Sequence, residues 1–218
     1  MKLQFDANQE YQLDAVKATV DLFAGQPVGV SDFSFAKATG IGGTFLSVVA
    51  NNLILDEETI LDNLKSVQEK VKKDNPQFEI SEKLDGLNFS IEMETGTGKT
   101  YVYLRAIHEL YETYGFKKFI IVVPILAIKE GTVKNLEITK EHFELIYNIR
   151  PDFYLFDPKK RGLSRNFATT NTLQIMVMNI DQFARAGNIF YQQSDWDVPA
   201  EFIKATRPVV IVDEPRVK

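Results

Sequence analysis

The sequence predicts an α/β fold, in which a parallel sheet is flanked by helices. Two observations support this class. Short apolar runs alternate with stretches of helical periodicity, and a glycine-rich loop joins a strand-like run to a helix-like run. The run at 119–123 is continuously apolar, which is typical of a buried parallel strand. Sheets of this kind bind ligands at the carboxyl ends of their strands.

Composition places the chain among ordinary globular proteins. Of its 218 residues, 44% are hydrophobic and 25% are charged, and the length supports one large or two small domains. The net charge of −5 gives no general attraction to nucleic acid, so such binding would need local basic patches. The absence of cysteine excludes disulfides and thiolate metal sites and fits a cytoplasmic protein. No apolar run is long enough to span a membrane.

The first part of the chain predicts two helices separated by a less regular region. The first helix is expected within residues 3–23, because apolar residues recur at helical spacing from Leu13 to Phe23. A hairpin or loop is expected around the glycines at 40–43, and a second helix begins near Asp56. We interpret residues 26–86 as an insertion between the first helix and the glycine-rich loop.

The glycine-rich loop at 94–100 has the residue types and the setting of a phosphate-binding loop. It follows a strand-like run at 87–92 and opens a helix-like run at 101–114. Glycines let backbone N–H groups converge on phosphate oxygens, and the start of a helix adds partial positive charge. We therefore expect a nucleoside triphosphate to be held by a set of adjacent residues: Thr95, Gly96, Thr97, Gly98, Lys99 and Thr100.

Two of these residues have separate roles. Lys99 is expected to reach the β- and γ-phosphates, and the Thr100 hydroxyl is expected to hold Mg²⁺. Met93 stands where a first glycine is common, but Gly96 and Gly98 still allow the tight turn. A chance glycine-rich turn is the alternative, and the strand–loop–helix setting argues against it.

The rest of the chain continues the alternation. Strands are predicted at 119–123, 153–156 and 173–178, and a last strand is predicted in the run 208–215. Helices are predicted at 127–136 and 181–186. A polar, basic loop is expected at 157–171, and a linker is expected to run through Trp196.

The last predicted strand ends in two carboxylates, Asp213 and Glu214. Such an ending can place one carboxylate on the water shell of Mg²⁺ and the other beside the attacking water. We expect Asp213 to serve the metal together with Thr100, and Glu214 to orient the water. Lys99, Asp213 and Glu214 are then the candidate catalytic residues. An ordinary acidic turn after a strand is the alternative.

Together these motifs resemble the first motor lobe of a superfamily 2 helicase. More narrowly, they resemble the Res subunit of type III restriction-modification enzymes. The resemblance covers nearly the whole chain and rests on five segments: 5–15, 92–103, 119–131, 178–183 and 212–215. It implies a RecA-like P-loop NTPase fold, with residues 1–218 as the first lobe and the 26–86 insertion inside it. Arg216 stands where the family usually has Gln.

The resemblance also assigns roles that spacing alone does not. By spacing, Gln12 is a plain surface residue of the first helix, whereas the family implies that it reads adenine. The segment at 123–131 is similar to a motif that touches the nucleic-acid backbone, which implies contacts by Lys129 and Gly131. ATP and Mg²⁺ are the implied cofactors. Double-stranded DNA and a methyltransferase (modification) subunit are the implied partners.

The same resemblance implies parts beyond this chain. A second motor lobe and an endonuclease domain are expected to follow, so the fragment alone should hydrolyse ATP poorly. Another superfamily 2 translocase and a non-catalytic nucleotide-binding module are the alternative functions.

A basic cluster formed by Lys159, Lys160 and Arg161, with Arg165 nearby, is a candidate DNA contact. Contacts of this kind go to phosphates and weaken with salt. A solvated surface loop fits the same residues, and both interpretations remain open.

Overall fold

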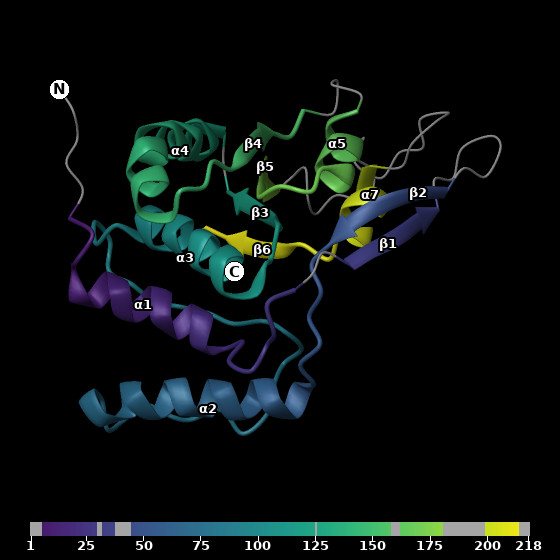
Figure 1. The fold of residues 1–218 in the computed structure, drawn as a ribbon. Coiled ribbons are helices and arrows are strands. Elements are labelled where there is room, and N and C mark those ends of the chain that lie inside the picture. Colours follow the sequence, from purple (N-terminus) through teal and green to yellow (C-terminus); the bar gives the residue numbers. More distant parts are fainter. Residues whose placement is uncertain are drawn as a thin grey trace. The chain divides into compact units, whose positions relative to one another are not determined.

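The structure is a computed structural model that describes residues 6–29, 32–37, 45–124, 126–157, 162–180 and 199–213. The chain divides into two compact units. The first comprises Met1–Val28 and Leu53–Tyr114, and the second comprises Gly29–Asn52 and Gly115–Lys218. Figure 1 labels the helices and strands of both units.

Within its described residues, the first unit is built from three helices: α1 (Glu10–Asp21), α2 (Glu57–Asp74) and α3 (Lys99–Tyr114). In this unit α1 lies between α2 and α3 (Figure 1). Val16 of α1 is buried against Val102 and Ala106 of α3. Near the C-terminal ends of both helices, the Tyr114 hydroxyl donates to the Val20 carbonyl at 3.0 Å. These contacts show that α1 and α3 run in the same direction.

The helix α2 begins where the sequence predicts. Its N-cap is Asp56, whose side chain accepts a hydrogen bond from the Thr59 N–H at 2.8 Å. This bond to the backbone lowers the pKa of the Asp56 carboxyl. Acidic residues occupy the first turn and basic residues the last, as the helix dipole favours.

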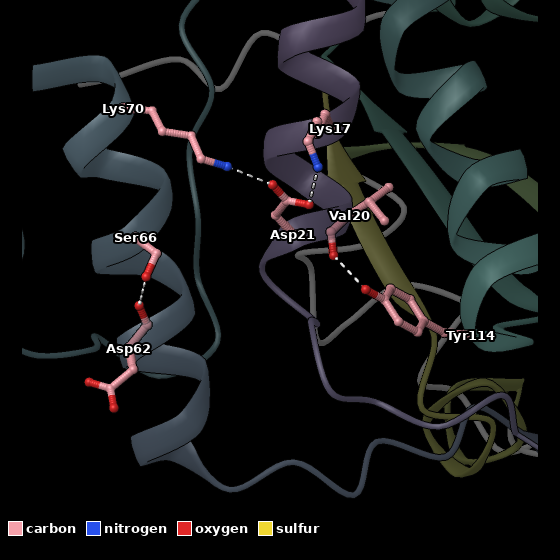
Figure 2. A network of polar contacts seen from close by, with 7 residues as sticks. All are labelled: Lys17, Val20, Asp21, Asp62, Ser66, Lys70 and Tyr114. Carbon is pink, nitrogen blue, oxygen red and sulfur yellow. Dashed lines mark hydrogen bonds and ion pairs between the residues drawn. The ribbon is translucent and has the colours of Figure 1, made fainter. Parts of the chain in front are cut away.

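Polar contacts hold α2 beside α1. Figure 2 shows Asp21 of α1 accepting from Lys17 at 2.8 Å and from Lys70 of α2 at 3.0 Å. Burial alone would raise the pKa of Asp21, but the two ammonium groups outweigh burial and lower it. Asn63 of α2 donates to the Leu22 and Ala24 carbonyls just beyond α1. Surface ion pairs of this kind are individually weak.

The second unit contains a parallel four-stranded sheet with the strand order β4–β5–β3–β6. Its strands are β3 (Lys118–Val123), β4 (Asp152–Leu155), β5 (Gln174–Asn179) and β6 (Val209–Val212). All six residues of β3 are buried, as the continuous apolar run predicts. Val123 pairs with Asn179 and Val122 with Val212, so three strands end at one edge of the sheet. The predicted α/β class is confirmed.

Three helices and a hairpin complete the described part of this unit. The helices are α4 (Leu126–Tyr147), α5 (Leu163–Thr169) and α7 (Pro199–Ala205). The antiparallel hairpin consists of β1 (Asp32–Lys37) and β2 (Phe45–Ala50), which agrees with the turn predicted between them. The glycines of that turn lie outside the described residues. No helix in the described ranges is both long and apolar enough to cross a membrane.

The core of the second unit lies where α5 and α7 meet the sheet. Phe167 of α5 and Ile203 of α7 pack against apolar side chains of β3 and β5, which are Ile120, Val122, Met176 and Met178. Val48 of the hairpin joins a second cluster with Ala168 and Phe202. Apolar burial of this kind supplies most of the stability of a domain.

Three predictions of secondary structure need correction. Residues 87–92 are irregular and not a strand, since among the described residues they pair with no strand of either sheet. The helix α4 extends to Tyr147 and does not end at 136, because buried residues continue at helical spacing: Leu136, Thr139, Phe143 and Tyr147. The predicted basic loop at 157–171 contains α5.

One further difference lies near the C-terminus. The helix α7 was not predicted, although its Phe202 and Ile203 are buried. The predicted helix at 181–186 and the linker through Trp196 lie outside the described residues.

A buried lysine, Lys118, stabilises the end of α5. Its ammonium donates to the carbonyls of Phe167 and Thr170, each at 2.5 Å, and lies 5.3 Å from the centre of the Phe167 ring. Burial lowers the pKa of Lys118 to about 7. A cation at a helix C-terminus interacts favourably with the helix dipole.

The side chain of Asn51, directly after β2, ties the hairpin to the sheet. Its Oδ1 accepts from the N–H groups of Lys117 at 2.7 Å and Lys118 at 3.0 Å. Its Nδ2 donates to the Lys118 carbonyl at 2.8 Å, and the residue is only 5% exposed. One amide therefore satisfies three backbone groups at the start of β3.

We predict that Asn51→Ala lowers the free energy of unfolding by about 2–4 kcal/mol, because buried backbone groups lose their partners. Urea unfolding followed by circular dichroism measures the change. Asn63→Ala is the matched control, since it also removes an amide bonded to carbonyls, but near the surface. We expect about 1 kcal/mol or less for the control. Equal losses in the two variants would contradict the role given to Asn51.

Candidate nucleotide-binding site

The glycine-rich loop turns sharply into α3. The N–H and the hydroxyl of Thr97 both donate to the Glu94 carbonyl, at 3.4 and 2.6 Å. Gly96 and Gly98 have φ values of +84° and +87°, which favour glycine. Lys99 and Thr100 are the first two residues of α3, and both are partly exposed. The loop therefore leads directly into a helix, as predicted.

Gln12 lies against this loop. Its Nε2 donates to the Thr97 carbonyl at 2.8 Å, and the residue is 8% exposed. A Cβ added to Gly98 would lie 2.6 Å from the same nitrogen, so this contact requires glycine at that position. Gln12 and Thr97 are 85 residues apart in the sequence. The structure therefore brings a predicted base-reading residue and the predicted phosphate loop together.

The start of α3 has the chemistry to bind an anion. Helical bonding begins with the Val102 N–H, which donates to the Gly98 carbonyl at 3.0 Å. The first N–H groups of a helix have no acceptor within the helix, and they carry the positive end of its dipole. Beside them stand the Lys99 ammonium, a further positive charge, and the Thr100 hydroxyl. Together these groups can bind a polyphosphate and present an oxygen to its metal ion.

Asp213 lies at the carboxyl edge of the sheet in the second unit. Its N–H donates to the Val122 carbonyl at 2.9 Å, directly after β6, and the residue is partly exposed. Asn179 ends β5 at the same edge. A carboxylate at this edge can serve the hydration shell of Mg²⁺. Glu214 lies outside the described residues.

Among the predicted DNA contacts, Lys129 has an internal position. It is buried in α4, and its ammonium donates to the Phe156 carbonyl, just after β4, at 3.0 Å. Burial lowers its pKa, and the neighbouring Asp157 partly opposes that effect. Gly131 is exposed, with no atom within 4 Å of an added Cβ.

The basic cluster is only partly described. Arg165 is exposed in α5, whereas Lys159, Lys160 and Arg161 lie outside the described residues.

Sequence reasoning missed a contact between α3 and the residues that precede α1. The Nη1 of Arg105 donates to the Ala7 carbonyl at 2.6 Å. Tyr101 lies one turn earlier and is buried, which raises the pKa of its hydroxyl. A bond from a side chain to a distant carbonyl leaves no trace in sequence periodicity. The only available signal was the spacing of Tyr101 and Arg105 on one helix face.

Comparisons with known proteins assign the family. Residues 57–215 match the family model described as "Type III restriction enzyme, res subunit". The Res subunit of the type III restriction-modification enzyme StyLTI, from Salmonella typhimurium LT2, is 34% identical over 157 residues. That alignment covers 60% of this chain and 16% of the relative.

Two other relatives align along almost the whole chain. The EcoP15I Res subunit of Escherichia coli is 28% identical over 243 residues, and the EcoPI Res subunit of Escherichia phage P1 is 27% identical over 239. These alignments cover 96% and 97% of this chain and 23% of each relative, so the chain spans less than a quarter of their length. The family model covers well over half of the chain, including Lys99 and Asp213, and the chain therefore belongs to the family of type III restriction enzyme Res subunits.

Proposed function

We propose that this chain is the ATP-binding first motor lobe of a type III restriction Res subunit. In the longer protein it would couple ATP hydrolysis to movement along double-stranded DNA. One observation carries the proposal: the loop with left-handed Gly96 and Gly98 turns directly into α3, whose first residues are Lys99 and Thr100. The loop amides, the helix dipole and the Lys99 ammonium would bind the β- and γ-phosphates, with Thr95 and Thr97 lining the same loop.

Thr100 and Asp213 are the residues that would supply ligands to Mg²⁺. A hydroxyl at Thr100 and a carboxylate at Asp213 supply the hard oxygen ligands that this ion prefers. When bound, the ion would neutralise the charge that develops on the phosphates. Lys99 would share that task, and Glu214 would orient the attacking water. Phosphoryl transfer consists mostly of such positioning and charge neutralisation.

Gln12 would read the adenine base. A glutamine amide offers one donor and one acceptor side by side, which matches the N7 and N6 edge of adenine. The position of Gln12 against the Thr97 carbonyl supports this role, since it is adjacent to the loop proposed for the phosphates. The side chain would then connect the base to the phosphate loop. We expect ATP to be preferred over GTP, because a wrong base leaves buried polar groups unpaired.

The DNA track would be completed by parts of the longer protein. In this lobe the proposed contacts with the DNA backbone are Lys129, Gly131 and the cluster Lys159–Arg161. Because the Lys129 ammonium is bonded to the Phe156 carbonyl, direct contact with a phosphate would require that side chain to turn outward. A second lobe would add the arginines of the ATP site, and an endonuclease domain would cut. A methyltransferase subunit in the cytoplasm would read the recognition sequence.

The nucleotide proposal predicts the effect of Lys99→Ala. This change removes a charge-assisted phosphate contact worth about 1.5–3 kcal/mol, so the Kd for MgADP should rise about tenfold or more. Calorimetric titration of the 218-residue chain measures it. Lys72→Ala at the exposed end of α2 is the matched control and should bind as the unaltered chain does. Equal affinities for all three proteins would contradict the phosphate loop.

The DNA proposal predicts the effect of reversing two adjacent charges. In a longer chain with both motor lobes, Lys159→Glu with Lys160→Glu should weaken DNA binding. The slope of log affinity against log salt should fall by about one per lost phosphate contact. Affinity for ATP should not change.

The control for that experiment is Lys72→Glu with Lys73→Glu, which reverses two adjacent exposed lysines on α2. If both double variants have the same salt slope and the same DNA-stimulated ATPase, the 159–161 cluster is ordinary surface.

A further inference from the structure

The segment before α1 is attached to α3 at Arg105, which follows the phosphate loop along that helix. Residues 6–9 belong to no helix or strand, and the Asn8 N–H donates to Asp6 Oδ1 at 2.9 Å. Arg105 reaches this segment from α3 and donates to the Ala7 carbonyl at 2.6 Å. The side chain of Arg105 is only 12% exposed. A charged donor makes a stronger bond to a carbonyl than a neutral donor does.

Arg105 is itself held by neighbours on its own helix. It hydrogen bonds with the hydroxyl of Tyr101, one turn earlier. Its Nε lies 3.9 Å from a carboxylate oxygen of Glu109, one turn later. A guanidinium carries several N–H donors in a rigid, planar fork, so it can serve these groups and the Ala7 carbonyl together. The guanidinium is therefore preorganised toward the N-terminal segment.

That segment determines where the first turn of α1 lies. The Gln9 carbonyl accepts from the N–H groups of both Gln12 and Leu13 at 3.0 Å, which starts the helix. The Gln12 side chain then reaches the Thr97 carbonyl. Ala7 and Gln12 thus fasten the two ends of a short stretch to Arg105 and to the glycine loop. If the bond between Arg105 and the Ala7 carbonyl were lost, the start of α1 would move, and the Gln12 amide would move with it.

We infer that Arg105 is a positioning residue for base recognition, because its bond to the Ala7 carbonyl keeps the Gln12 amide beside the glycine loop. The inference rests on the proposed role of Gln12 in reading adenine. Farther along α1, Val16 packs against Val102 and Ala106, and Val20 accepts from Tyr114. These contacts do not involve Arg105, so its loss affects the first turn of α1 and not the whole helix. Base choice changes, whereas binding of the phosphates at Lys99 persists.

The test compares MgADP and MgGDP binding to the 218-residue chain by calorimetry, in Arg105→Met, in Gln12→Ala and in the double variant. The affinity ratio of ADP to GDP should fall about threefold or more in Arg105→Met, with little change for GDP. In the Gln12→Ala background, Arg105→Met should lower the ratio no further. A merely structural role would weaken both nucleotides equally in either background.

Two more variants make the test specific. Lys17→Met removes a cation and an ion pair from α1 without touching the N-terminal segment, and its ratio should match that of the unaltered chain. Tyr101→Phe removes only the hydroxyl that holds Arg105 and should lower the ratio in the same direction by a smaller factor. If Arg105→Met does not fold, as judged by circular dichroism, Tyr101→Phe decides the question.

The outcomes separate this inference from the proposed function. If the chain binds neither nucleotide, or binds both equally whether or not Gln12 is present, the proposed role of Gln12 fails and the inference fails with it. If ADP is preferred through Gln12 and the ratio is unaltered in Arg105→Met and Tyr101→Phe, the inference about Arg105 alone is wrong.

Discussion

One side-chain hydrogen bond, from the Gln12 amide to the Thr97 carbonyl, joins the first helix to the glycine loop, and much of the first unit keeps that bond in place. The bond is worth only about 1 kcal/mol, so it cannot hold α1 by itself. Burial of Val16 against α3 supplies the larger part of the attachment. Arg105 then holds the segment before α1, Tyr114 holds the last turns of α1, and Gly98 leaves the room that the Gln12 amide needs.

In the second unit, the two ends of the parallel sheet differ in character. The amino end is closed by buried polar groups, because the Asn51 amide satisfies the start of β3 and the Lys118 ammonium is bonded to the end of α5. The carboxyl end instead carries Asn179 and Asp213, which are partly exposed. Buried and satisfied polar groups rigidify a fold, whereas partly exposed polar groups at the carboxyl edge of a parallel sheet can be reached by a ligand. The proposed catalytic carboxylate therefore lies at the edge where parallel sheets bind ligands.

Periodicity predicted the parts of this fold that are set by apolar burial. The α/β class, β3 and the helices α1 to α3 follow from apolar spacing together with glycine, proline and capping residues. The short helix α5 was hidden because its sequence is mostly polar, with Phe167 and Ala168 as its main buried anchors. The glycine loop could be recognised because its chemistry is local. Arg105 and the internal bond of Lys129 could not, since each joins a side chain to a carbonyl far away in sequence, and no local pattern records such a pairing.

The central claim is that the turn from the glycine loop into α3 is a phosphate site connected to α1. Amide hydrogen exchange of the 218-residue chain, with and without saturating MgADP, tests it most directly. The account predicts slower exchange in the nucleotide-bound protein at the loop and start of α3, residues 96–101, together with the first turn of α1, residues 10–13. Binding of MgADP that leaves exchange at both segments unaltered and protects only other residues would contradict the account.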